Sequence, residues 1–146
     1  EAFSEAAKLT PERSNVHSAL SFVHYLRGDV AESLMEAEEA VRRNPYDRLG
    51  QEQLALAYHA RGDQDRAMAA AQEAVRLGPK TDTAYYVLGL CYIDAGEPEK
   101  AVEAFETFLD LYWDRAYVRD WKEEAVALLE VRPQGNSPAG DSRMEL

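Results

Sequence analysis

The chain is short of the residues that many specialised functions need. It has a single cysteine among 146 residues, so no disulfide can form within it. No stretch approaches the roughly 18 consecutive apolar residues of a membrane span. Its 16 lysines and arginines are outnumbered by 27 aspartates and glutamates, which gives a formal net charge of -11. Because nucleic-acid binding depends on clusters of basic side chains, a nucleic-acid partner is disfavoured.

Catalytic and metal-binding motifs are missing as well. The sequence has no glycine-rich phosphate loop, no paired serine and histidine of a hydrolase and no metalloprotease helix. His17 and His24 would share one helix face, but no cysteine or third histidine stands beside them at ligand spacing, which favours packing over metal binding. Cys91 has no evident base nearby, so we expect a buried structural thiol. The chain is predicted not to be an enzyme and to hold no cofactor or metal.

The sequence does contain an internal repeat. Prolines recur every 34 residues at Pro11, Pro45 and Pro79, and glycines recur at the same interval at Gly28, Gly62 and Gly96. Between them the apolar residues follow helical spacing. Each glycine can end one helix with a positive φ, after which Asp29 or Asp63 can cap the next helix, or Pro98 can begin it. The period therefore predicts a series of antiparallel helix pairs.

Small side chains would let the two helices of each pair approach closely. They are Ser21 opposite Ser33, Ala55 opposite Ala67, and Gly89 opposite Ala101. Each pair can bury only one of its faces by itself. We therefore expect the pairs to fold together as one continuous stack.

These positions resemble the tetratricopeptide repeat family, whose period is 34 residues. The third repeat carries the family pattern in Tyr85, Leu88, Gly89, Tyr92, Ala101 and Phe105. The second carries it in Leu54, Ala55, Tyr58, Ala67, Ala71, Ala74 and Pro79. The first carries it in Leu20, Ser21, Ser33, Ala37, Ala40 and Pro45, with His17 and His24 in place of two aromatics. Two residues depart from the pattern: Phe108 stands where a small residue is usual, and Trp113 where a proline closes the repeat.

The resemblance implies an all-α fold, a right-handed superhelical stack of antiparallel helix pairs, or α-solenoid, with a C-terminal capping helix. We divide residues 1–131 into the end of a truncated repeat (1–13), three repeats (14–47, 48–81 and 82–114) and the cap (115–131). Phe3, Ala6 and Pro11 match the end of the truncated repeat.

The capping helix is predicted to begin after Asp114 as its N-cap and to run from about Arg115 to Val131. Its apolar stripe is Tyr117, Trp121, Ala125 and Leu128, and its opposite face carries Arg119, Lys122, Glu123 and Glu130. Because no proline separates it from the third repeat, it could instead continue that repeat's last helix. Residues 132–146 are rich in Pro, Gly, Ser and Asn and are expected to form a flexible tail. Docking of Met144 and Leu146 on an apolar surface is a further hypothesis.

The family usually binds a peptide or helix of another protein on the concave surface formed by the first helices of successive repeats. The repeat register predicts the residues that line this groove: Asn15, Ser18, Phe22, Tyr25, Leu49, Glu52, Leu56, His59, Thr83, Tyr86, Leu90 and Ile93. No Lys or Arg is among them. A clamp for a partner's terminal carboxylate, which one branch of the family builds from Lys, Arg and Asn, is therefore disfavoured.

The predicted lining is mostly apolar and aromatic, which favours a hydrophobic or amphipathic segment as the ligand. The stack itself could cover part of this face, and Leu56 and Leu90 are the residues that it would most readily bury. Acidic residues concentrate at Glu32, Glu36, Glu38 and Glu39, where a solvated outer face is the simpler interpretation and docking of a basic partner the alternative. The expected partner is thus an amphipathic segment with basic flanks.

Two functions remain open at the level of sequence. One is an adaptor, scaffold or chaperone-like module that binds a partner protein, and the other is a structural subunit that assembles with itself through the groove or its N-terminal end. Small acidic three-repeat chaperones of secretion systems are similar in size and charge, although a chain that begins within a repeat is more typical of a piece of a longer protein. A cytoplasmic location is slightly favoured, but a signal or anchor could precede residue 1, and a membrane would be reached only through such a segment.

Overall fold

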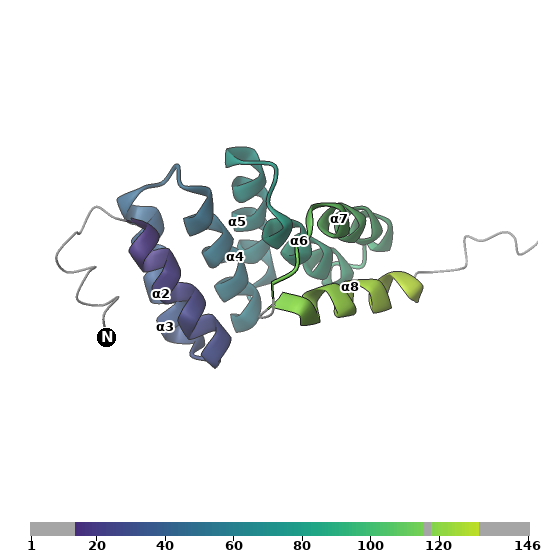
Figure 1. The fold of residues 1–146 in the computed structure, drawn as a ribbon, viewed down its shortest axis with the longest axis horizontal. Helices are drawn as coiled ribbons and strands as arrows, with labels where there is room; N and C mark the ends of the chain where they lie inside the picture. The colour runs from purple at the N-terminus through teal and green to yellow at the C-terminus, as the bar shows by residue number, and fades with distance from the viewer. Residues whose placement is uncertain (1–13, 116–117, 132–146) are drawn as a thin grey trace, which may run out of the picture.

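The computed structural model describes residues 14–115 and 118–131 and places seven helices in them. These are α2 (Ser14–Arg27), α3 (Val30–Arg43), α4 (Arg48–Arg61), α5 (Gln64–Leu77), α6 (Asp82–Asp94), α7 (Pro98–Leu111) and α8 (Arg119–Glu130). The pairs α2/α3, α4/α5 and α6/α7 follow one another along the long axis of the molecule, and α8 runs beside α6 and α7 (Figure 1). No strand occurs in the described ranges. The molecule is an all-α solenoid, as predicted.

The turns within the pairs use glycine as expected. Gly28, Gly62 and Gly96 have φ values of 82°, 91° and 74°, which a residue with a Cβ rarely adopts. The Asp63 side chain caps α5 by accepting a hydrogen bond from the backbone N–H of Arg66. Asp29 makes no such cap, so that prediction is wrong: its carboxylate lies 3.5 Å from Nδ1 of His24 instead.

Small side chains bring the helices of each pair together, as the sequence predicts. Ser21 and Ser33 are fully buried, and each hydroxyl donates to the other residue's backbone carbonyl at 2.8 and 2.9 Å. The two polar groups therefore leave no unpaired hydroxyl in this contact. In the third pair, a Cβ on Gly89 would overlap the ring of Phe105. Only glycine fits there.

The end of the third repeat differs from the prediction. Helix α7 ends at Leu111 and Tyr112 is extended, so the alternative of one continuous helix is wrong. Helix α8 begins only at Arg119, because Asp114 is not its N-cap: the Asp114 carboxylate pairs with Arg119 at 2.8 Å and accepts a hydrogen bond from the Tyr112 hydroxyl. These contacts lower the pKa of Asp114 to about 2, and the hydrogen bond with Arg119 has the largest effect.

Several predicted features can be placed and others cannot. Phe108, which departs from the family pattern, is fully buried and packs against Tyr86 and Tyr112 at ring-centre distances of 5.6 Å. The predicted charged face of the cap, with Arg119, Lys122, Glu123 and Glu130, is exposed. The truncated repeat with Phe3, Ala6 and Pro11, the stripe residue Tyr117, and the tail with Met144 and Leu146 lie outside the described residues.

Candidate functional site: a partly occupied concave groove

The predicted groove residues lie on α2, α4 and α6, but they differ widely in exposure. Asn15, Leu49 and Ile93 are exposed, Phe22, Tyr25, His59 and Leu90 are half-buried, and Ser18, Glu52, Leu56, Thr83 and Tyr86 are buried. Leu56 is covered, as considered from the sequence, whereas Leu90 keeps part of its surface. We call the surface formed by these residues the concave groove. It is far less open than a bare stack of hairpins.

The chain's own C-terminal part covers the middle of the concave groove. The Trp121 ring from α8 stacks on Tyr86 with centres 4.6 Å apart and an interplanar angle of 10°. Its edge also meets Tyr25 of α2 at 6.4 Å, and Tyr25 in turn stacks on Phe22. Trp121 therefore links the first and third hairpins across the concave groove.

The two tyrosine hydroxyls in this cluster differ in their hydrogen bonds: that of Tyr86 donates, whereas that of Tyr25 accepts from the Trp121 side chain. The Tyr86 hydroxyl donates to the Glu124 carboxylate of α8 at 2.6 Å. Burial, followed by this carboxylate, raises the pKa of Tyr86. Burial likewise raises the pKa of Tyr25. Both phenols stay protonated throughout the physiological range, so the contact with Glu124 persists.

A second, charged part of the groove lies where α4 and α6 begin. Arg48 donates to the Glu52 carboxylate at 2.6 Å, and Arg115 pairs with Asp82 at 3.0 Å. Burial raises the pKa of Glu52, although the Thr81 hydroxyl and Arg48 oppose it. A cavity of about 280 Å³ opens here between Phe22, Leu49 and Thr83 on the groove side and Trp113 and Val118 on the C-terminal side.

Sequence reasoning missed these basic groups. Arg48, Lys80 and Arg115 all line the cavity, although no Lys or Arg stands at a predicted groove position. Arg48 could have been found because it directly precedes Leu49 on the same helix. Arg115 could not, since it reaches the groove only through the return of the chain after α7. Arg48 and Arg115 are already paired with carboxylates, so they do not form an open carboxylate clamp.

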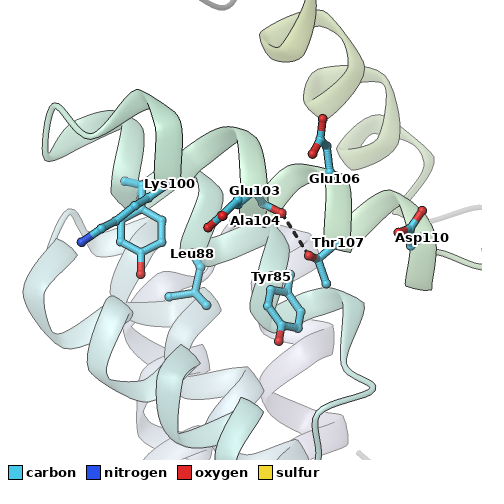
Figure 2. A pocket seen from close by; sticks show the side chains of 9 residues that line it. Tyr85, Leu88, Lys100, Glu103, Ala104, Glu106, Thr107 and Asp110 are labelled. Atoms are coloured by element: carbon cyan, nitrogen blue, oxygen red, sulfur yellow. Dashed lines mark hydrogen bonds between the residues drawn. The ribbon is translucent and has the colours of Figure 1, made fainter.

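A separate notch lies between α6 and α7. It has a volume of about 550 Å³ and is lined by Tyr85, Leu88 and Tyr92 from α6 and by acidic and polar side chains of α7, among them Glu103 and Asp110 (Figure 2). A similar notch of about 310 Å³ lies between α4 and α5. In both, a cation lies over a tyrosine ring: Lys100 is 5.8 Å from the centre of Tyr92, and Arg66 is 6.0 Å from that of Tyr58. The notches therefore repeat with the hairpins.

The first hairpin differs at the same register. His17 is buried and its Nδ1 lies 2.6 Å from the Glu36 carboxylate. This is the packing role predicted for His17. No group of three potential metal ligands occurs in the part of the chain that the structure describes. Of the other acids on α3, Glu32 and Glu38 are exposed, as a solvated face requires.

Cys91 is buried within the stack, with its Sγ 3.4 Å from Oε1 of Gln64 on α5. Burial, with smaller effects from Asp94 and Asp65, raises the pKa of the Cys91 thiol to about 11. A thiol of this kind is poorly nucleophilic at neutral pH. Its environment agrees with a structural role.

A family model of the tetratricopeptide repeat matches residues 23–82 and 52–116, which together make up more than half of the chain. The chain belongs to the tetratricopeptide repeat family. No curated protein matches the sequence. Among the described helices of this tetratricopeptide repeat protein, none is both long and apolar enough to cross a membrane.

Solved tetratricopeptide repeat structures share the fold at low sequence identity. The type III secretion chaperone SycD of Yersinia enterocolitica, in complex with a peptide of the translocator YopD, is 17% identical with a TM-score of 0.65, covering 78% of this chain and 87% of that one. An alternative dimer of SycD gives a TM-score of 0.67 at 17% identity, over 80% and 89% of the two chains. The TPR2B domain of yeast Sti1 in its Hsp70 complex gives 0.67 at 17% identity, over 81% and 94%.

Proposed function

We propose that this chain is a protein-interaction module that binds an apolar or amphipathic segment of a partner protein in its concave groove. The observation that carries the proposal is that the groove already holds a bulky apolar side chain, Trp121, between aromatic residues of the first and third hairpins. A surface that accepts an indole from α8 has the shape and chemistry to accept a similar side chain from another protein. Peptide complexes of SycD and of the Sti1 domain support the same use of the fold.

The rest of the groove supports an apolar contact. Ile93 on α6 and Leu49 on α4 are 42% and 40% exposed, and Leu90, three residues before Ile93, is half-buried. Burying three such side chains contributes about 1.5–3 kcal/mol each before the cost of association is subtracted. The net charge of -11 favours a partner with basic flanks and disfavours nucleic acid. Such a module needs no catalytic group.

The test is binding by a groove variant compared with a matched surface variant. We expect Leu90→Glu with Ile93→Glu to lose at least tenfold in affinity for a partner captured by the wild-type chain, because a carboxylate would have to be desolvated in the interface. Met35→Glu, with Met35 64% exposed on α3 and absent from the groove, is the control and should bind normally. Equal binding by both variants would exclude the concave groove as the interface.

Self-assembly is the second candidate function. Val23 and Leu26 on α2 are 38% and 48% exposed, and SycD forms a dimer on the same fold. An assembling chain would show a mass that rises with concentration in sedimentation, whereas an adaptor would stay monomeric until its partner is added.

A further inference from the structure

The chain's C-terminal part meets the concave groove through three anchors spaced three residues apart. Arg115 pairs with Asp82, and the two side chains are only 8% and 9% exposed. Val118 is 1% exposed, and Trp121 stacks on Tyr86. Arginine and tryptophan are among the residue types that dominate binding at protein interfaces. Two of the three anchors are therefore of the kind found in a bound peptide.

The fit between this part of the chain and the groove is incomplete. The cavity of about 280 Å³ lies directly beside the anchors, with Val118 and Trp121 in its wall. Gln53, which also lines it, is buried and its Oε1 has no hydrogen-bond partner. The cavity opens at the surface, so it has room for a further side chain beside this unpaired amide oxygen. A different occupant with a larger side chain or an N–H donor at this place would fill the groove better.

We infer that Arg115, Val118 and Trp121 occupy the groove as an internal ligand, and that the partner segment carries the same anchors: an arginine, an aliphatic residue three positions later and an aromatic residue three positions after that. The inference rests on the proposed function and names the class of its ligand. The partner binds by displacing Trp121 and Arg115. Its arginine faces Asp82, and its aromatic residue stacks on Tyr86.

A partner must displace the internal ligand, and this requirement sets the affinity that the partner needs. A segment tethered by a short linker competes at an effective concentration on the order of millimolar. A partner with the same anchors and no more would therefore bind weakly to the intact chain. Filling the cavity beside Gln53, or adding contacts at Leu90 and Ile93, is how a partner segment exceeds the internal one.

The experiment uses the full chain and a labelled peptide of residues 112–131. The chain has two tryptophans, so Trp113→Phe leaves Trp121 as the sole reporter of groove occupancy. The peptide has phenylalanine in place of both tryptophans and is silent in tryptophan emission. Peptide anisotropy reports binding, and the emission maximum of Trp121 reports displacement. We expect both to change with the same midpoint, the emission moving to longer wavelength as the indole enters water.

Variants separate the internal ligand from the groove. We expect Trp121→Ala in the chain to bind the peptide at least tenfold more tightly, because its competitor has lost the main anchor. Met35→Ala, where the side chain is 64% exposed on α3 and outside the groove, is the control and should leave the affinity unchanged. Tyr86→Phe keeps the ring but removes the hydrogen bond to Glu124, so it loosens α8 without opening a cavity and should tighten binding a few-fold. A peptide with Arg115→Glu should bind at least tenfold more weakly.

Two results would overturn the inference and leave the proposed function distinguishable from it. Peptide binding with no change in Trp121 emission would mean that the peptide docks elsewhere. No binding even to the Trp121→Ala chain would mean that these anchors do not define the ligand. In either case the comparison of Leu90→Glu, Ile93→Glu with Met35→Glu still decides whether the concave groove binds a partner at all.

Discussion

At the scale of single residues, burial of polar groups decides how the groove responds to pH. Glu52 is 5% exposed, and its contacts with Arg48 and Thr81 do not fully offset its loss of water. The native state therefore holds the Glu52 proton to a higher pH than the unfolded chain does, where a glutamate titrates near about 4.3. The free energy of unfolding falls as pH rises from that value through the pKa in the folded protein.

Replacing Glu52 should remove this fall in the free energy of unfolding at higher pH. We expect the melting temperature of Glu52→Gln to exceed that of wild type by a margin that grows as the pH is raised from about 4 to about 7, since glutamine cannot ionise. Differential scanning calorimetry at several pH values measures the change. Glu38→Gln, on the exposed part of α3, is the control and should shift little. A Glu52→Gln effect that is the same at every pH would contradict the role of burial.

At the scale of elements, the close approach of α6 and α7 depends on the missing side chain of Gly89. Helix propensity alone would favour alanine over glycine by about 1 kcal/mol. The new methyl group, however, would overlap the Phe105 ring, which is 1% exposed. The overlap with Phe105 should therefore outweigh the gain in helix propensity.

We expect Gly89→Ala to lower the free energy of unfolding by about 1–3 kcal/mol in urea denaturation. Combining it with Phe105→Leu should cost less than the sum of the two single changes, because the smaller side chain leaves space for the methyl group. Gly50→Ala should be milder, since its Cβ would lie 3.1 Å from Cγ2 of Val41. Additive effects at Gly89 and Phe105 would show that the two residues do not press on each other.

The sequence predicts a helix or turn correctly where residues that are close together in the chain determine it. The 34-residue interval predicted the hairpins, the positive φ of Gly28, Gly62 and Gly96, and the close pairs such as Ser21 with Ser33. The start of α8 was not predictable from Asp114, because an N-cap residue and a partner for Arg119 look the same in sequence. The occupation of the groove by Trp121 was missed for a different reason: it depends on a contact between residues at opposite ends of the array.

At the scale of the whole molecule, charge should govern how fast a partner arrives. A chain with a net charge of -11 attracts a segment with basic flanks over distances comparable to the Debye length, about 10 Å at 0.1 M salt. We expect the association rate of such a peptide to fall about tenfold or more as salt is raised, with little change in its dissociation rate, in stopped-flow measurements. A peptide with neutral flanks is the control. A dissociation rate that carries the salt effect would instead indicate ion pairs within the bound complex.

The contact of Trp121 with both Tyr25 and Tyr86 also changes how the array comes apart. In an open solenoid each repeat touches only its neighbours, so the terminal repeats can fray one after another. Here the first hairpin, the third hairpin and α8 share one aromatic cluster, which closes the line of nearest-neighbour contacts into a loop. Loosening any one of them weakens the others. The terminal hairpin amides should therefore exchange with solvent by the same cooperative opening as the central ones, rather than ahead of them.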